Sequence, residues 1–275
     1  MSPSVTVVTG AGAGLGKACA IALLQNEIVV LVDRDKAGLE LTRQEIAERR
    51  DSDLGVYAIP CDVAEPEEVG QLFNFLDGLG RIGSLVHAAG VSMAMTDWAT
   101  IFRVNLYGTA LILRAAQDRL EPGAAAVCFS SMASYTPGLD SAEIDAIIDE
   151  PLAPDLINKL AVIDAGRVDE PTKAYAWSKR GVRRLVVRTA AAWGPTGRIT
   201  SVSPGIIDTP MYQAELRRSP AMADIINWMP LRRLGEPAEV ADVVKFLLSY
   251  DARYLTACDI PIDGGAIALM QLNTN

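Results

Sequence analysis

Apolar segments without polar interruptions alternate along the chain with segments whose apolar residues recur at the spacing of a helix face. The apolar segments predict strands at residues 5–9, 28–32, 56–60, 84–88, 125–130 and 199–202. The segments of helical period include residues 17–24, 37–50, 66–79 and 172–192. Strands that are apolar on both faces are typical of a parallel sheet covered by helices on each side. We therefore expect the α/β fold class, with a doubly wound parallel sheet in three αβα layers and right-handed crossovers.

Residues 134–172 interrupt this alternation, because connections between such elements usually have about 2 to 6 residues. Isoleucines and leucines recur there at helical spacing in two groups separated by prolines: Ile144, Ile147 and Ile148, then Leu156, Ile157, Leu160 and Ile163. Ser141 stands where the residue that caps a helix N-terminus is expected. No repeat or linker divides the rest of the sequence. We predict a single domain over residues 1–275, with a helical segment inserted at 134–172.

The composition excludes several classes of protein. Hydrophobic residues make up 50% of the 275 residues and charged residues 21%, so the chain can bury enough apolar surface to fold. Its apolar runs, such as 124–129, fall well short of the roughly 18 residues that a membrane-spanning helix needs. The first residues carry no basic segment, so we expect no signal peptide.

The net charge is −9, from 25 basic and 34 acidic residues. A protein that binds nucleic acid normally presents a basic patch, so we expect no nucleic-acid partner. The acidity is concentrated in residues 134–172, where nine acidic and two basic side chains give a net charge of −7 and leave −2 for the rest of the chain. We expect the carboxylates of this segment to face water while its isoleucines and leucines face the protein.

Four cysteines are scattered along the chain without a Cys-x-x-Cys pair: Cys19, Cys61, Cys128 and Cys258. Each has apolar neighbours, which favours buried, reduced thiols over disulfides or metal ligands. We therefore expect a cytoplasmic protein that holds no metal.

A glycine-rich loop follows the first predicted strand. The spacing G-x-G-x-x-G does not fit, whereas T-G-x-x-x-G-x-G fits at Thr9, Gly10, Gly14 and Gly16. Glycines permit a tight turn, and the N-terminus of the following helix offers free N–H groups to a pyrophosphate. Such a loop can also serve strand-to-helix packing alone, but its position after the first strand favours a dinucleotide.

Asp33 ends the second predicted strand, 17 residues beyond Gly16, which is near the spacing of about 20 residues expected for a carboxylate that binds ribose hydroxyls. Because a carboxylate there repels a 2′-phosphate, we predict NAD rather than NADP as the cofactor. The alternatives are a helix cap or a solvated side chain, and the adjacent Arg34 leaves room for NADP.

Tyr175 and Lys179 lie four residues apart at the start of a predicted helix, which places both side chains on one face. A phenol with the usual pKa of about 10 is a poor base at neutral pH. A neighbouring ammonium, together with an oxidised nicotinamide, favours the phenolate and makes the pair a candidate for acid/base catalysis. The same spacing also arises by chance.

Together these motifs resemble the short-chain dehydrogenase/reductase family of the classical type, over residues 5–265. The resemblance implies a Rossmann-type fold and catalytic roles for four residues. Tyr175 is similar to the family's catalytic acid/base, and Lys179 to the residue that lowers its pKa and binds the nicotinamide ribose. Ser131 resembles the catalytic serine. Asn105 resembles the asparagine that helps organise a water-mediated proton relay.

The resemblance also implies which residues contact the cofactor. Asp62 matches the acid that contacts adenine, and the segment 203–209 matches the loop over the nicotinamide amide. The implied cofactor-binding residues are Gly10, Ala13, Gly14, Leu15, Gly16, Asp33, Arg34, Asp62, Val63, Ala89, Gly90, Tyr175, Lys179, Pro204, Gly205, Ile207 and Thr209.

Two departures from the family pattern stand out. The usual N-N-A-G after the fourth strand is replaced by H-A-A-G at residues 87–90, so the asparagine side chains are missing while Gly90 can still approach the cofactor. His87 is the only histidine, and its place in an apolar strand favours a structural role over that of a general base. The other departure is the separation of 44 residues between Ser131 and Tyr175, which is much longer than usual. The insert must therefore loop out and return.

Family members resembling 3-alpha-hydroxysteroid dehydrogenase/carbonyl reductase also carry an insert at this place. Relatives of this type are usually homo-oligomers joined partly through the helix that carries the tyrosine. An insert before that helix can cap its face, so a homodimer and a homotetramer both remain open. We expect the insert to form a solvated cover beside the active site.

Large apolar side chains follow the two loops that shape the substrate site in such sheets. They are Met93, Met95, Met211, Tyr212, Leu216, Met222, Ile225, Ile226, Trp228 and Met229. They either form core and subunit contacts or line a pocket for a bulky, apolar substrate. We predict an NAD-dependent oxidoreductase that interconverts a secondary alcohol, hydroxysteroid-like or terpenoid-like, with its ketone. The alternatives are an NAD(H)-binding regulatory protein with little turnover and an enzyme of epimerase or dehydratase type.

Overall fold

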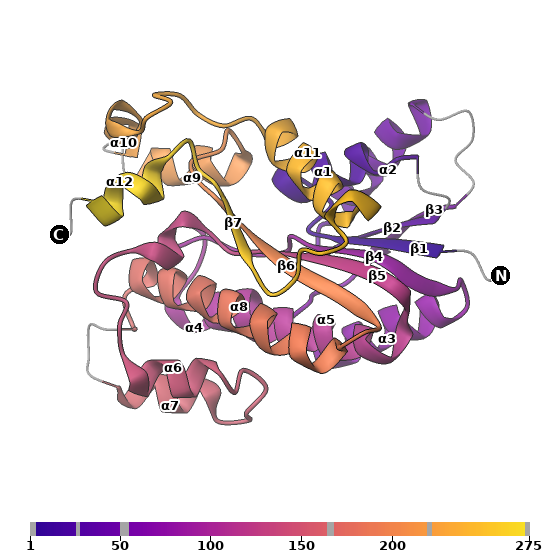
Figure 1. The fold of residues 1–275 in the computed structure, drawn as a ribbon, viewed down its shortest axis with the longest axis horizontal. Coiled ribbons are helices and arrows are strands. Elements are labelled where there is room, and N and C mark those ends of the chain that lie inside the picture. Colours follow the sequence, from indigo (N-terminus) through magenta and orange to yellow (C-terminus); the bar gives the residue numbers. More distant parts are fainter. Residues whose placement is uncertain (1–3, 26–27, 50–54, 164–167, 219–221, 273–275) are drawn as a thin grey trace.

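A parallel sheet forms the centre of the molecule (Figure 1). The computed structural model describes residues 4–25, 28–49, 55–163, 168–218 and 222–272. Within them, seven strands follow the order β3-β2-β1-β4-β5-β6-β7. The strands are β1 (Ser4–Thr9), β2 (Ile28–Asp33), β3 (Val56–Pro60), β4 (Arg81–His87), β5 (Leu120–Phe129), β6 (Gly197–Pro204) and β7 (Asp259–Ile262). All neighbouring strands are parallel, so the predicted doubly wound sheet is confirmed.

Helices cover both faces of the sheet, as Figure 1 shows. On one face lie α1 (Gly14–Ala22), α2 (Lys36–Glu48) and α11 (Pro237–Leu248). On the other lie α3 (Pro66–Asp77), α4 (Trp98–Phe102), α5 (Thr109–Ala116) and α8 (Pro171–Trp193). Because successive side chains of a strand point to opposite faces, Leu31 joins one apolar core and Val32 the other. The three predicted layers are therefore present.

The edge strand β7 was not predicted from the sequence. It has only four residues, and Asp259 and Pro261 leave no apolar run to identify it. Pairing with β6 defines it. The remaining elements lie in the connections: a π-helical turn η1 (Arg103–Gly108), the 3-10 turns η2 (Gln117–Arg119), η3 (Met132–Tyr135) and η4 (Tyr250–Ala252), and the helices α9 (Pro210–Arg218), α10 (Met222–Trp228) and α12 (Ala266–Leu272).

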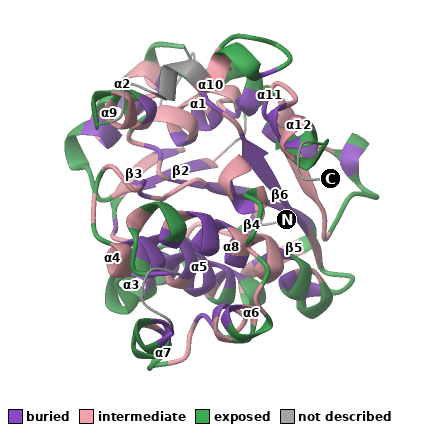
Figure 2. Cartoon of the chain, turned by 90° about the vertical axis from the view of Figure 1, so that its left-hand side faces the viewer, coloured by how far each residue is buried: buried purple, intermediate pink, exposed green. Residues whose placement is uncertain are grey.

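The insert folds as two short helices, α6 (Ala142–Ile148) and α7 (Leu156–Val162). The N–H of Ile144 donates to the hydroxyl of Ser141 at 3.4 Å, which confirms the predicted cap. The apolar side chains of both helices join the core on this side of the sheet, as predicted: Ile144, Ile148, Leu156, Leu160 and Ile163 are buried. Figure 1 shows α6 and α7 on the side of α8 that faces away from the sheet. Much of α7 is exposed, whereas α5 is largely buried (Figure 2).

The acidic residues of the insert correct one prediction. Asp145 on α6 and Asp149, which caps the C-terminus of that helix, face α8 and not water. Arg180 donates two hydrogen bonds to Asp145, at 2.8 and 2.7 Å, and Arg184 donates two to Asp149, at 2.6 and 2.5 Å. Arg188, one turn further along α8, also pairs with Asp149 at 3.1 Å. A spacing of four residues on both helices brings these charges into line, which neither helix reveals by its own sequence.

Several further expectations concern single residues. All four cysteines carry free thiols; Cys19, Cys61 and Cys128 are buried and Cys258 is half-buried. In the part of the chain that the structure describes, no helix has the length and apolar character needed to cross a bilayer. Nor do three or more His, Cys, Asp or Glu side chains of those residues gather so as to hold a metal ion. The predictions for residues 1–3, for Arg50 at the end of a helix, and for Asp164 and Arg167 in the insert lie outside the described residues.

Candidate active site

A cleft of about 380 Å³ opens at the carboxyl ends of β1 to β4. The strand order reverses between β1 and β4, which is where ligands bind in open α/β sheets. Its lining includes most of the expected cofactor residues: Gly10, Ala13, Gly14, Leu15, Gly16, Asp33, Arg34, Asp62, Val63, Ala89, Gly90 and Thr209. Lining residues that the sequence analysis did not assign to the cofactor are Gly12, Asp35, Cys61, Ala88, Val91, Met95, Val104, Pro210, Met211 and Ala214.

The glycine loop leaves no room for side chains on its inner side. Gly10 has φ +69°, and a Cβ there would lie 2.7 Å from the Ala89 nitrogen. A Cβ on Gly16 would overlap the Gly10 carbonyl. The N-terminus of α1, after Ala13, is capped by no side chain, so its N–H groups are open to the cleft. Such a cradle suits the pyrophosphate of a dinucleotide.

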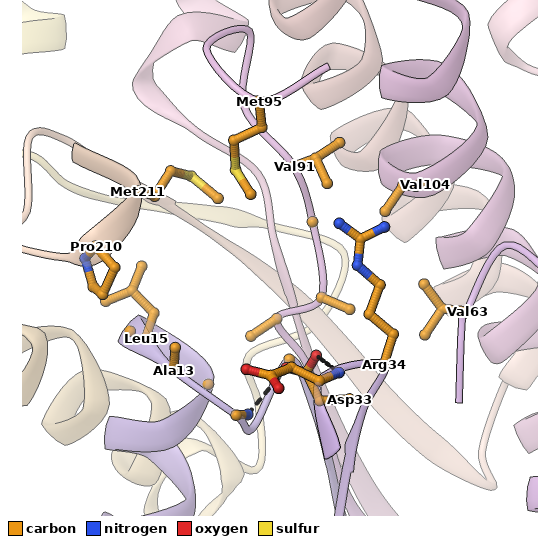
Figure 3. Close-up of a pocket in the computed structure, with 18 of the residues that line it drawn as sticks. Ala13, Leu15, Asp33, Arg34, Val63, Val91, Met95, Val104, Pro210 and Met211 are labelled. Atoms are coloured by element: carbon orange, nitrogen blue, oxygen red, sulfur yellow. Dashed lines mark hydrogen bonds between the residues drawn. The ribbon is translucent and has the colours of Figure 1, made fainter. Parts of the chain in front are cut away.

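Asp33 lies in the wall of the cleft at the end of β2 (Figure 3). One carboxylate oxygen accepts from the Gly12 N–H at 3.0 Å and the other accepts from the Asp35 N–H at 3.0 Å. The N-cap of α2 is Asp35, which accepts from the Ala37 N–H, so Asp33 is not that helix cap. Arg34 extends across the cleft toward Val63 and Val104 (Figure 3). The carboxylate is held by backbone groups and keeps lone pairs for ribose hydroxyls.

Asn105 is fixed directly behind the floor of the cleft. It lies in the π-helical turn η1, a kind of turn that often marks functional sites. Its amide grips the main chain of Val91, accepting from the N–H at 2.8 Å and donating to the carbonyl at 2.9 Å. A Cβ on Gly90 would lie 3.0 Å from the Asn105 Oδ1 and 3.4 Å from the Lys179 Nζ. A side chain at position 90 would therefore crowd the amide of Asn105.

The structure brings Ser131 and Tyr175 together despite the insert between them. Ser131 follows β5 and caps η3, where its hydroxyl accepts from the Ala133 N–H at 3.2 Å. Tyr175 lies near the start of α8, close enough to Ser131 for the serine side chain to lower the pKa of the phenol. Two hydroxyl groups that meet at one point can hold one substrate oxygen.

Lys179 lies one turn beyond Tyr175 and is almost fully buried. Its ammonium donates to the Phe129 carbonyl at 2.8 Å and lies 5.8 Å from the centre of the Tyr175 ring. Burial lowers the pKa of Lys179 to about 8. The neighbouring Ser130 hydroxyl donates to the Lys179 carbonyl at 2.9 Å, which ties the end of β5 to α8.

The surroundings of Tyr175 keep its phenol protonated. Burial raises the pKa of Tyr175 to about 12, the hydrogen bond with Ser131 lowers it, and the negative charge of Glu215 raises it. Glu215 lies on α9, and burial also raises the pKa of this carboxyl group while a hydrogen bond with Ser92 opposes the change. Sequence reasoning missed Glu215, because no motif marks a carboxylate that tertiary packing turns toward the site.

Five expected cofactor residues do not line the cleft: Tyr175, Lys179, Pro204, Gly205 and Ile207. Gly205 packs against Asp263, the residue after β7. A Cβ on Gly205 would lie 2.7 Å from the Asp263 Cα. Ile207 lines a separate cavity of about 90 Å³. No described residue of the insert lines the cleft either, since α8 separates the insert from the sheet.

The apolar residues expected around the substrate divide into two groups. Met95, after β4, and Met211, on α9, approach each other across the cleft (Figure 3). Tyr212 and Met229 are instead buried in a small separate core, against which Leu216 and Ile225 pack. The other members are Met93, partly buried in the main core, the half-buried Ile226 and the exposed Trp228. The side chain of Met222 lies outside the described residues.

Comparison with known proteins gives two family matches. Residues 4–142 match the family described as short chain dehydrogenase, and residues 156–266 match the family described as enoyl-(acyl carrier protein) reductase. The chain is similar to a short-chain dehydrogenase/reductase of Alternaria brassicicola, with 31% identity over 100% of both chains.

Two further relatives carry more specific names. Levodione reductase of Leifsonia aquatica is 28% identical over 96% of this chain and 94% of its own. The 3-alpha-hydroxysteroid dehydrogenase/carbonyl reductase of Comamonas testosteroni is 27% identical over 98% of each. The crystal structure of levodione reductase superposes with a TM-score of 0.78 at 26% identity, over 98% of this chain and 99% of that one.

Proposed function

The chain belongs to the short-chain dehydrogenase/reductase family, and from this premise we propose that it is an NAD-dependent enzyme that interconverts a bulky, apolar secondary alcohol and its ketone. Membership makes the chain an oxidoreductase that acts on alcohol or carbonyl groups with NAD(H) or NADP(H). The choice of NAD, the substrate and the catalytic roles of single residues belong to the proposal.

The observation that carries the proposal is the grouping of Tyr175 with Ser131 and Lys179: Ser131 lowers the pKa of the phenol, and the Lys179 ammonium lies 5.8 Å from the centre of the Tyr175 ring. The hydroxyl groups hold the substrate oxygen from two sides, and the nicotinamide, when bound, accepts or supplies the hydride. Tyr175 exchanges the proton with that oxygen. Lys179 and a water held near Asn105 then pass the proton on, because the Lys179 ammonium and the Asn105 amide both lie behind Gly90.

The buried surroundings of Tyr175 suit proton donation. With a pKa of about 12 the phenol is protonated at neutral pH and can give its proton to the oxygen of a ketone that is being reduced. In the direction of alcohol oxidation the phenol must first lose its proton. A positive charge on the nicotinamide ring favours that loss, as does the ammonium of Lys179.

Asp33 supports NAD over NADP. Its carboxylate lies in the cleft wall and is held there by two backbone N–H groups. A fixed negative charge at this place accepts hydrogen bonds from ribose hydroxyls and repels a 2′-phosphate. Arg34 does not remove this repulsion in the structure, because its side chain extends away from Asp33 toward Val63 and Val104 (Figure 3).

Met95 and Met211 support an apolar substrate. Thioether side chains adapt to irregular apolar surfaces and suit a bulky hydrocarbon skeleton. Among the similar proteins are one named levodione reductase and one named 3-alpha-hydroxysteroid dehydrogenase/carbonyl reductase, and the second name supports a steroid-like skeleton. A hydroxysteroid-like or terpenoid-like alcohol is therefore the substrate class that we propose.

The test is the formation of NADH from NAD with a panel of secondary alcohols, set beside loss of NADH with the matching ketones. Hydroxysteroids and terpenoid alcohols should react faster than small polyols and sugars, and the reverse order would overturn the substrate class. Tight NADH binding without turnover of any member would favour a regulatory protein. Conversion of substrate without net change in NADH would favour an epimerase or dehydratase.

A further inference from the structure

The proposed chemistry gives no role to the buried, titratable side chain of His87. His87 ends β4 at the centre of the sheet, is 2% exposed and is the only histidine of the chain. Hydroxyl groups contact both ring nitrogens. Nδ1 lies 2.9 Å from the Thr9 Oγ1, and Nε2 lies 3.0 Å from the Thr109 Oγ1.

The direction of each hydrogen bond follows from the Asn105 carbonyl, which can only accept. Thr109 Oγ1 lies 2.6 Å from the carbonyl oxygen of Asn105, which can only accept, so the Thr109 hydroxyl donates its one proton there. His87 must then donate to Thr109, which places the ring proton on Nε2. In a neutral imidazole Nδ1 is then an acceptor, and it receives the proton of the Thr9 hydroxyl. The Thr9 oxygen in turn accepts from the Ala89 N–H at 3.2 Å.

The imidazole has the surroundings of a neutral group. Burial lowers the pKa of His87 to about 3, and the positive charge of Lys179 acts in the same direction. Cys128 lies opposite His87 on β5, and burial raises the pKa of that thiol to about 12, so it remains uncharged. Thr9 and Thr109 complete the polar contacts of the ring and carry no charge.

The four hydrogen bonds therefore form one chain with a single direction. It begins at the N–H of Ala89, a residue that lines the floor of the cofactor cleft. It ends at the main-chain carbonyl of Asn105 in the π-helical turn. Asn105 is thus held through two groups: its side-chain amide hydrogen-bonds the main chain of Val91, and its main-chain carbonyl accepts from Thr109. This chain of hydrogen bonds links β1, β4 and α5.

We propose that His87 is a positioning residue: as the Nε2–H tautomer it bridges Thr9 and Thr109 and so fixes the Asn105 carbonyl relative to the floor of the cofactor cleft. Its effect on turnover rests on the function proposed above. The hydrogen bonds themselves do not, so they can be tested without a substrate.

The tautomer can be read directly, because His87 is the only histidine. In protein labelled with ¹⁵N-histidine and freed of any histidine tag, one pair of ring nitrogens should appear, with Nε2 of the protonated type and Nδ1 of the unprotonated type. Both signals should stay constant between about pH 5 and about pH 8, across the usual range of histidine titration. The opposite tautomer, or a titration within that range, would overturn the proposal.

The Asn105 carbonyl, at the far end of the chain of hydrogen bonds, can also be observed by NMR. Asn105 and Leu106 form the only Asn-Leu dipeptide of the sequence, so labelling with ¹³C-carbonyl asparagine and ¹⁵N-leucine isolates the Asn105 carbonyl. Thr109→Val removes its hydroxyl donor and should shift this signal, whereas Thr109→Ser should return it to the wild-type position. His87→Leu should shift it as well, although His87 does not touch the carbonyl. An unchanged carbonyl signal in His87→Leu would refute the coupling.

Kinetics separate positioning from a purely structural role. His87→Leu and Thr109→Val should lower kcat by about 10- to 100-fold, because small displacements of positioned groups are costly, while the Kd for NADH changes less than about twofold. Thr109→Ser should recover most of kcat. Ile112→Val, in the same helix α5 and fully buried, serves as a destabilised control and should leave both kcat and the carbonyl signal near wild type.

The outcomes also separate this inference from the proposed function. If wild-type protein turns over no alcohol or ketone, the proposed function fails while the two NMR experiments still decide the hydrogen-bond chain. If His87→Leu loses only thermal stability and keeps wild-type kcat, the positioning role is refuted and the proposed function stands.

Discussion

Arg184 on α8 binds both carboxylate oxygens of Asp149, the C-cap of α6, at 2.6 and 2.5 Å, and so fastens the insert to the helix that carries Tyr175. The side chain of Asp149 is 13% exposed and that of Arg184 is 35% exposed. The pair is therefore partly shielded from solvent, between the limits of surface and buried ion pairs. A double-mutant cycle with Arg184→Ala and Asp149→Ala should give a coupling energy of about 1 to 2 kcal/mol in urea unfolding.

The insert supplies a matched control for that cycle. Lys159 and Asp155 pair at 3.1 Å on α7, with side chains that are 51% and 52% exposed. Because this pair is solvated, its coupling energy should not exceed about 0.5 kcal/mol. Equal coupling in both cycles would contradict the role given to Arg184 and Asp149.

Replacing Tyr175 by phenylalanine removes the hydroxyl that exchanges the proton and keeps the ring. We expect kcat to fall by at least about 100-fold, as is usual for loss of a general acid or base. The Kd for NADH, measured by fluorescence, should stay within about twofold, since Tyr175 does not line the cofactor cleft. Tyr250→Phe, at a residue that is 78% exposed, is the control. Retention of most turnover by Tyr175→Phe would refute the assignment.

Replacing Asp33 by asparagine removes the negative charge and keeps an acceptor for the Gly12 N–H. The wild-type enzyme should have a much higher kcat/KM with NADH than with NADPH, and Asp33→Asn should narrow the difference by about tenfold or more. Asp97→Asn, which alters a carboxylate that caps α4 by accepting from the Thr100 N–H, should not change the preference. Comparable use of both cofactors by the wild type would contradict the assignment of Asp33.

The stability of the protein should fall in acid partly because of His87. Its pKa is lowered to about 3 in the folded chain, against about 6.5 when unfolded, so between these values only the unfolded chain binds the proton. This contribution is complete above about pH 6.5 and declines as the pH falls, with a slope of up to about 1.4 kcal/mol per pH unit. Urea unfolding should show a shallower acid slope for His87→Asn. An equal slope would mean that His87 titrates normally.

The insert should also limit how subunits assemble. Asp145 and Asp149 pair with Arg180 and Arg184 on α8, so we expect this face of α8 to form no contact between subunits. We expect light scattering to give the mass of a homodimer rather than a homotetramer. Reversing both charges, with Asp145→Arg and Asp149→Arg, detaches the insert by repulsion and should change that mass. A wild-type tetramer whose mass the reversal leaves intact would contradict a capping role.

Much of the site followed from short sequence patterns. The glycine loop and Asp33 were predicted because backbone approach and strand ends leave local signatures. The cofactor roles of Pro204, Gly205 and Ile207 stay predictions, since these residues lie outside the cleft wall. Glu215 had no local signature at all, because its nearness to Tyr175 depends on how α9 packs beside Ser92 and Met93, which follow β4.

The insert shows the limit of such patterns most clearly. Helical periodicity predicted its two helices and the burial of their isoleucines, but it could not tell which carboxylates would meet α8. That choice depends on two helices that lie 35 residues apart in the chain at Asp145 and Arg180. The net charge of the insert by itself suggested a solvated surface, whereas two of its carboxylates pair with the arginines of α8.

The sequence by itself determined the layered α/β fold, the cleft at the reversal of strand order and the residue types that meet there. These properties rest on the period of apolar residues and on glycines, which act through the backbone next to them. Only the tertiary structure decided how His87 is protonated and what it holds. Its tautomer depends on two hydroxyl groups, of Thr9 and Thr109, that lie far apart in the chain and meet the ring only when β1, β4 and α5 pack together.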